Sequence, residues 1–142
     1  MILRFTVPGV AKGKESVRKG RYGNEYIPAM TREFMKKVAD AYTKAYFFEG
    51  AVFMEVNCYF PIPKSYTKKQ RLEIAENDYL YTHKPDGDNV LKAIKDALTK
   101  EAYEDDRFVV YEHCFRRYAK EGEEPRVEIV LYDRAGGKIN AQ

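Results

Sequence analysis

The sequence has few of the residues that bind soft metals. Its 142 residues include two cysteines, two histidines and no tryptophan. Cys58 and Cys114 each stand in a segment with strand-like alternation, without CxxC spacing and without a histidine in register for zinc. We therefore expect both thiols to be reduced and to pack as small apolar side chains, and we expect no zinc site.

Long apolar runs are also missing. No stretch approaches the roughly 18 apolar residues of a membrane span, and the N-terminus MILRFTVPG lacks the basic-then-apolar layout of a signal peptide. The chain has no Walker loop and no Rossmann glycine pattern. With 44% hydrophobic and 33% charged residues, it is predicted to form one domain over residues 1–142, in the cytoplasm and without a membrane partner.

The net charge is only +3, but the positive charge is unevenly distributed. Three basic clusters are formed by Lys12, Lys14, Arg18, Lys19 and Arg21, by Lys64, Lys68, Lys69 and Arg71, and by Arg116, Arg117 and Lys120. Basic side chains of this kind often serve solubility alone. Because the clusters flank an acidic centre, they also suit a nucleic acid held through its phosphates, with a cation between it and the carboxylates.

The hydrophobic periodicity predicts both strands and helices. Strand-like alternation covers residues 2–7, 52–60, 109–118 and 126–132. Helical spacing runs from a cap at Thr31 to about residue 49, over 65–77, and after Asp88, while residues 9–28 form a basic surface arm. Because regular βαβ alternation is missing, this order predicts an α+β fold in which helices pack on one mixed or antiparallel sheet.

The acidic centre is the segment HKPDGDNVLKAIKDAL, residues 83–98. Pro85 biases its start away from helix, so Asp86 and Asp88 are expected to point to the same side of an extended chain. Asp88 also stands where a helix N-cap belongs, and the helix dipole offsets part of the repulsion between the two carboxylates. Lys92 follows one turn later on the same helix face.

Further acidic groups, Asp105 and Asp106, stand on the turn after this helix. Several carboxylates without histidine or thiolate favour a hard cation, Mg²⁺ with Mn²⁺ as its substitute. Such an ion activates water and neutralises phosphate charge, and Lys92 is placed to stabilise the charge that grows on the phosphate. Taken alone, the local chemistry is also explained by an ordinary helix cap and solvated turns.

Two rival motifs do not fit the acidic segment. An EF-hand loop starting at Asp86 needs a ligand, a glycine and a glutamate where Val90, Leu91 and Ala97 stand. A phosphotransferase with a nucleophilic aspartate needs an apolar strand directly upstream, which YTHKP does not provide. Metal-assisted chemistry on a phosphate ester remains the enzymatic interpretation of this segment.

The segment KPDGDNVLKAIKDAL, followed by YEDDRFVV, resembles the signature of the RusA family of Holliday junction resolvases. The resemblance is specific over residues 84–110, where several fixed spacings agree together. It implies a homodimeric, Mg²⁺-dependent endonuclease that nicks opposing strands of four-way junction DNA during recombination and repair. The family often has a small polar residue and Gln after the DD pair, where this chain has Arg107 and Phe108. That departure leaves the sequence preference of cutting open.

The resemblance also implies roles for individual residues. Asp86, Asp88, Asp106 and Lys92 correspond to the family's catalytic set, with the three aspartates as metal ligands. Asp105 is expected to support these ligands from outside the metal's coordination shell, and Asn89 to bond backbone or phosphate, although ordinary turn structure explains both residues equally well. The residues expected to contact DNA are Lys12, Lys14, Arg18, Arg21 and Lys84, together with Tyr22 on the arm.

Symmetry gives a physical reason to expect a dimer, because a twofold pair of sites can make two matched cuts in a four-way junction. Two other functions remain open at the level of sequence. One is a catalytically inert nucleic-acid-binding module, and the other is a metal-dependent hydrolase of a small phosphate ester. A small-molecule hydrolase has no use for three basic clusters, and its substrate binding would be insensitive to salt.

Overall fold

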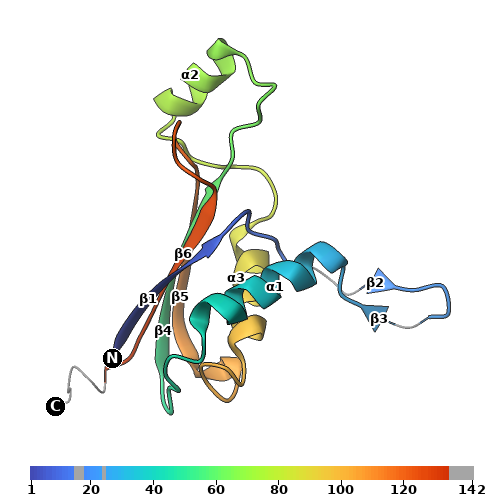
Figure 1. The fold of residues 1–142 in the computed structure, drawn as a ribbon, viewed down its shortest axis with the longest axis vertical. Helices are drawn as coiled ribbons and strands as arrows, with labels where there is room; N and C mark the ends of the chain where they lie inside the picture. Colours follow the sequence, from blue (N-terminus) through green and yellow to red (C-terminus); the bar gives the residue numbers. More distant parts are fainter. Residues whose placement is uncertain (15–17, 24, 135–142) are drawn as a thin grey trace.

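A computed structural model describes residues 1–14, 18–23 and 25–134, with only the backbone described at Arg18, Lys19 and Glu25. In chain order the elements are β1 (Ile2–Pro8), β2 (Arg18–Lys19), β3 (Glu25–Tyr26), α1 (Ala29–Tyr42), β4 (Val52–Phe60), α2 (Lys68–Glu76), α3 (Gly87–Leu98), the 3-10 turn η1 (Asp106–Phe108), β5 (Val109–Tyr118) and β6 (Arg126–Tyr132). The predicted α+β class, with helices packed on one main sheet, is confirmed (Figure 1).

The main sheet has four strands in the order β1-β6-β4-β5. β6 pairs antiparallel with both β1 and β4, whereas β4 and β5 run parallel. The sheet is therefore mixed, and a purely antiparallel arrangement is excluded for these strands. The parallel pair is possible because residues 61–108, which include α2 and α3, form a long crossover between β4 and β5.

Alternation along β4 sets the inside and outside of the sheet. Val52, Met54, Val56 and Cys58 are fully buried, and the residues between them are half-buried. The inner face carries the hydrophobic core and is covered by α1 and α3, which lie on the same side of the sheet in Figure 1. Burying one face of a strand in this way is what period-two alternation predicts.

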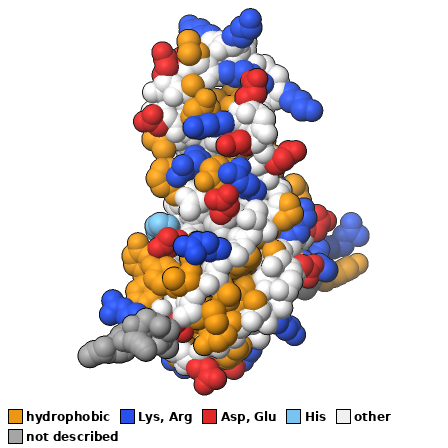
Figure 2. Space-filling view, turned by 60° about the vertical axis from the view of Figure 1, so that its left-hand side comes forward, with side chains coloured by type: hydrophobic (Ala, Val, Ile, Leu, Met, Phe, Trp, Pro, Cys, Tyr) orange, Lys and Arg blue, Asp and Glu red, His pale blue; other side chains and the backbone are white. Residues whose placement is uncertain are grey.

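The opposite face of the sheet lies away from α1 and α3. Residues on this face include Tyr111 and Phe115 of β5, which are 45% and 43% exposed. Figure 2, seen from the left-hand side of Figure 1, shows hydrophobic side chains gathered over the lower half of the molecule and mixed charges above. Phe53 stacks against Tyr132 on this face, with ring centroids 5.2 Å apart.

Helix α3 lies against β5 and buries one apolar stripe. Its buried residues are Val90, Leu91, Ala93, Ile94 and Leu98, close to the stripe that the sequence predicts. Helix α1 is shorter than predicted, because Thr43 and Lys44 take positive φ angles of 56° and 48° that end it after Tyr42. Thr31 is not its cap but a buried residue within its first turn.

Helix α2 stands at the far end of the long strands from α1 (Figure 1). Thr67 and Gln70 form a capping box at its start, and none of its residues is buried. The chain then returns along the edge of β5, where the Tyr118 N–H donates to the Tyr79 carbonyl at 2.7 Å and the Tyr81 N–H to the Arg116 carbonyl at 3.3 Å. This return path leads directly into the predicted acidic centre.

Within the described ranges, no helix is both long enough and apolar enough to cross a membrane.

Candidate active site at the start of helix α3

The start of α3 holds two of the predicted catalytic aspartates. Asp86 is the N-cap, and its Oδ1 accepts a hydrogen bond from the Asn89 N–H at 3.1 Å. Asp88 was expected to be the cap but lies inside the first turn. That expectation was wrong, because the extended backbone around Pro85 ends at Asp86, and the helix already begins at Gly87.

This shift changes how the two carboxylates are related. Asp86 keeps extended backbone as the N-cap, whereas Asp88 lies in the first helical turn, so the two residues do not share the extended chain that the sequence predicted. Both side chains are exposed at the helix N-terminus, where the dipole and the free N–H groups favour negative charge. Lys92 is also exposed and follows Asp88 by one turn, as predicted.

A small apolar contact fixes α3 against β5. A methyl group added at Gly87 would lie 3.4 Å from the Cβ of Cys114, so helix and strand are close there. The Cys114 thiol lies 3.7 Å from the Cys58 thiol, and both are free cysteines. The hydrogen bond between the thiols, together with burial, raises the pKa of Cys58, so this thiol stays neutral beneath the acidic residues.

Arg116 holds the bend that precedes Asp86. Its Nη1 donates to the His83 carbonyl at 2.8 Å and to the Pro85 carbonyl at 3.1 Å. The sequence placed Arg116 only within a basic cluster. On β5 it lies two residues after Cys114, and so on the same face of the strand, but no local pattern in the sequence assigns it to this bend.

The basic arm begins beside the start of α3. The Lys14 N–H donates to the Asn89 carbonyl at 2.8 Å, and the Thr31 hydroxyl donates to the Gly13 carbonyl at 3.1 Å. Gly13 lies so close that an added Cβ would be 2.9 Å from the Cβ of Asn89. The arm is thus fastened between α1 and α3, a contact that the sequence did not predict.

The predicted DNA-binding residues have different environments. Lys12 is half-buried, Lys84 and Arg21 are exposed, and Tyr22 is 88% exposed. Lys14 forms an ion pair with Asp96 of α3. The side chain of Arg18 lies outside what the structure describes, although its backbone pairs with Tyr26 in the hairpin β2-β3. This hairpin, which extends away from α1 in Figure 1, agrees with the predicted surface arm.

The second acidic pair lies at the other end of α3. Asp105 Oδ1 caps η1 by accepting from the Arg107 N–H at 2.9 Å, and this bond lowers the pKa of Asp105. Asp106 is exposed and begins η1, which leads into the first residue of β5. Gly87, in contrast, lies level with Cys114, five residue steps or about 16 Å further along that strand.

A single copy of the chain therefore does not bring Asp106 to Asp86 and Asp88. Among residues 1–14, 18–23 and 25–134, no group of three His, Cys, Asp or Glu side chains could hold a metal ion. The two carboxylates at the start of α3 nevertheless have the right donor chemistry for Mg²⁺. This ion usually keeps several waters and is bound through one or two carboxylates plus substrate phosphates.

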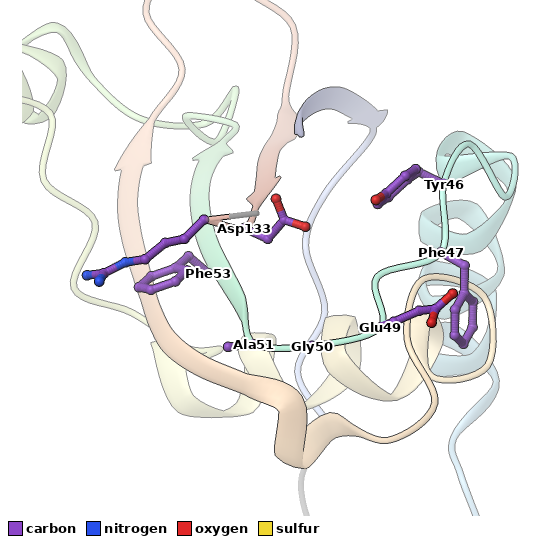
Figure 3. A pocket seen from close by; sticks show the side chains of 8 residues that line it. Tyr46, Phe47, Glu49, Gly50, Ala51, Phe53 and Asp133 are labelled. Atoms are coloured by element: carbon purple, nitrogen blue, oxygen red, sulfur yellow. The ribbon is translucent and has the colours of Figure 1, made fainter. Parts of the chain in front are cut away.

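A cavity of about 460 Å³ lies where β4 begins and β6 ends. Figure 3 shows its lining, which includes Tyr46, Phe47, Glu49, Phe53 and Asp133. None of the predicted catalytic residues lines it. It is therefore not the candidate site.

Comparison with known proteins identifies the family of this chain. The family model described as "Endodeoxyribonuclease RusA" matches residues 7–132. The chain is also similar to the "Uncharacterized protein YqaN" of Bacillus subtilis (strain 168), with 37% identity over 138 residues, covering 91% of this chain and 94% of that protein. The family match runs from the end of β1 to the end of β6 and includes Asp86, Asp88, Asp105 and Asp106, and this chain belongs to the RusA family of endodeoxyribonucleases.

Proposed function

We propose that this protein resolves Holliday junctions by paired, symmetric nicks that depend on Mg²⁺, in DNA recombination and repair. One observation carries the proposal beyond the family match. The basic arm is fastened directly to the helix start that carries Asp86 and Asp88. A phosphate backbone bound along the arm would therefore run toward two exposed carboxylates, an arrangement that needs a cation between them.

Asp86 and Asp88 would hold the metal, and the helix N-terminus lowers the cost of keeping both ionised. The bound ion would supply an activated water and positive charge beside the scissile phosphate, with Mn²⁺ as a possible substitute. Asp86 remains tied to the Asn89 N–H, so one carboxylate has a fixed orientation. Lys92 would stabilise the charge that develops on the phosphate, because it projects from the same helix one turn away.

Asp106 would join this site from the second copy of a homodimer. Within one copy α3 separates it from Asp86, whereas a twofold axis can bring the end of one helix near the start of its partner. Asp105, already ordered by the Arg107 N–H, would support Asp106. Two such shared sites would cut opposing strands of the junction.

Phosphate contacts away from the metal would come from the basic arm and its surroundings. The proposed residues are Lys12, Lys14, Arg18, Arg21 and Lys84. Lys84 and Arg21 are exposed and free to rotate toward DNA, whereas Lys14 would have to exchange Asp96 for a phosphate. We therefore expect Lys14 to contribute least of these side chains to DNA affinity.

The test is cleavage of a synthetic four-way junction with Mg²⁺, with the cut positions mapped on all strands. Wild-type protein should cut symmetrically related strands, and Asp88→Asn should bind the junction but cut at least about a hundredfold more slowly. Asp96→Asn is the matched control for the cutting rate, because Asp96 lies on the same helix but is ion-paired to Lys14, and the release of Lys14 changes junction affinity and not the chemical step. Binding without cutting by the wild-type protein would favour an inert binding module instead.

A further inference from the structure

A second cavity, of about 260 Å³, is lined in part by Tyr81 and His83, which precede Asp86 in the chain. Its lining is almost entirely aromatic and prolyl, and comprises Val10, Phe60, Pro61, Pro63, Tyr66, Tyr81, His83 and Tyr118. We call it the aromatic cavity. It is formed where the end of β4 meets the return path from α2, and no step of the proposed cleavage uses it.

The walls of the aromatic cavity are held rigidly. Tyr81 stacks on Phe60 with ring centroids 3.8 Å apart and an interplanar angle of 12°, and it meets the edge of Tyr118 at 5.0 Å. The Tyr81 hydroxyl donates to the Lys84 carbonyl at 2.7 Å. Burial raises the pKa of Tyr118 to about 12, so its phenol keeps its proton at neutral pH. The cavity therefore offers flat faces and neutral hydroxyl groups.

Basic residues surround this aromatic lining. Lys84 follows His83 directly, Lys64 follows Pro63, and the Arg116 guanidinium binds the His83 carbonyl. Lys120 lies with its Nζ 5.3 Å from the ring centroid of Tyr79, on the return path that leads to Tyr81. An apolar aromatic interior with a positive rim is the combination that binds the bases and phosphates of a nucleic acid strand.

We propose that the aromatic cavity holds one unstacked base of the junction, on the strand whose phosphate lies at Asp86. The inference rests on the proposed function and deepens it by naming the part that reads the DNA beside the cut. A cavity of this size is smaller than the roughly 300–1,000 Å³ sites of drug-sized ligands and suits a single base. A base that is already unpaired at the crossover is also the least costly to take out of the stack.

The position of the cavity sets the distance between this base and the cut. Three residue steps separate His83 from Asp86, which corresponds to at most about 10 Å of chain. At about 3.4 Å per nucleotide along one strand, the captured base lies within about three nucleotides of the cleaved phosphate. The cavity would thus determine which positions near the crossover are cut.

The test uses junctions that each lack one base, placed at every position within three nucleotides of the mapped cut. Affinity is measured by fluorescence anisotropy without divalent metal, and cleavage with Mg²⁺. For the wild-type protein, one missing base should weaken affinity about tenfold. In the double variant Tyr66→Ala/His83→Ala, which avoids the buried Phe60 and Tyr118, the same missing base should change affinity less than about twofold.

Phe47→Ala is the control, because Phe47 is an exposed aromatic in the other cavity and should keep the tenfold effect. Thermal unfolding of each variant checks that the fold is retained. If the wild-type protein cuts junctions but no missing base affects it, or if the double variant keeps the sensitivity, the inference is overturned while the proposed function stands. If the wild-type protein neither prefers nor cuts junctions, the proposed function fails and the inference fails with it.

Discussion

The two halves of α3 use acidic residues differently. In the second half and its surroundings, Asp96 pairs with Lys14, and Glu112 of β5 pairs with Lys95 at 2.8 Å. At the start of the helix, no lysine or arginine among the described side chains pairs with Asp86 or Asp88. The same chemical group is therefore neutralised at one end and left exposed at the other.

This difference separates acidic residues that hold the fold from those available to a ligand. An ion-paired carboxylate joins α3 to its neighbours and has little capacity left for a metal. Two exposed carboxylates at a helix N-terminus repel each other, and the helix dipole offsets only part of that repulsion. A divalent cation relieves the remainder, which is why we assign the chemistry to the first half of α3.

The largest expected effect comes from combining two inactive variants. Asp88→Asn and Asp106→Asn should each abolish cutting as homodimers. If each site takes Asp88 from one copy and Asp106 from the other, a co-expressed mixture forms heterodimers with one intact site. About one quarter of all sites should then be active, and the mixture should nick junctions. Cleavage gels on the co-expressed mixture measure this, and half of the sites should be active once the heterodimer is purified.

The opposite outcome would place the whole site within one copy of the chain. In that case every heterodimer would carry one damaged residue in each site, and the mixture would stay as inactive as either variant alone. Each variant must first bind junctions with wild-type affinity, which excludes loss of folding as the reason for inactivity.

The next effect compares two lysines of α3. Lys92→Ala should lower the single-turnover cleavage rate about a hundredfold with little loss of junction affinity, because its charge matters most as the phosphate expands. Lys95→Ala removes a lysine that already pairs with Glu112, and it should change the rate only a few-fold. Equal losses of rate and affinity in Lys92→Ala would contradict its assigned role.

A smaller effect tests the attachment of the arm to α3. Gly13→Ala would place a methyl group 2.9 Å from the Cβ of Asn89 and 3.0 Å from that of Pro85. We expect this overpacking to cost about 1–3 kcal/mol of stability and to weaken junction binding. Gly50→Ala meets no atom within 4 Å and should cost less than about 0.5 kcal/mol. Urea unfolding and junction titrations of both variants give the comparison.

The smallest expected change in stability separates the two roles of Asp86, as helix cap and as metal ligand. Asp86→Ala removes the helix cap and should cost about 1 kcal/mol of stability, whereas Asp86→Asn keeps a capping oxygen and should cost far less. Both variants should lose cleavage, because both lose the negative charge. An active Asp86→Asn protein would show that Asp86 serves only as a cap.

Much of the local structure could be predicted from the sequence. Strands 52–60, 109–118 and 126–132 match the observed β4, β5 and β6. Burial alternates from residue to residue along β4 and β6, as the sequence pattern predicts, but not along the edge strand β5. The motif at the start of α3 was identified for a related reason, since its charges, glycine and proline are all local signals.

The remaining features depend on contacts between distant segments. The parallel pairing of β4 and β5, the approach of Gly13 to Asn89 and the bond from Arg116 to Pro85 each join residues far apart in the chain. No local pattern encodes such pairs. The predicted N-cap of α3 was wrong by two residues, Asp88 instead of Asp86, because the exact residue at which a helix begins depends on fine details of backbone geometry.

The most direct measurement of the central claim is Mn²⁺ binding to the purified protein, followed by electron paramagnetic resonance. The comparison needs wild-type protein, Asp88→Asn and Asp96→Asn at equal concentration. If the exposed carboxylates at the start of α3 capture the ion, Asp88→Asn should bind Mn²⁺ at least about tenfold more weakly while Asp96→Asn binds like the wild type. Equal binding by all three proteins, or a loss confined to Asp96→Asn, would contradict the account.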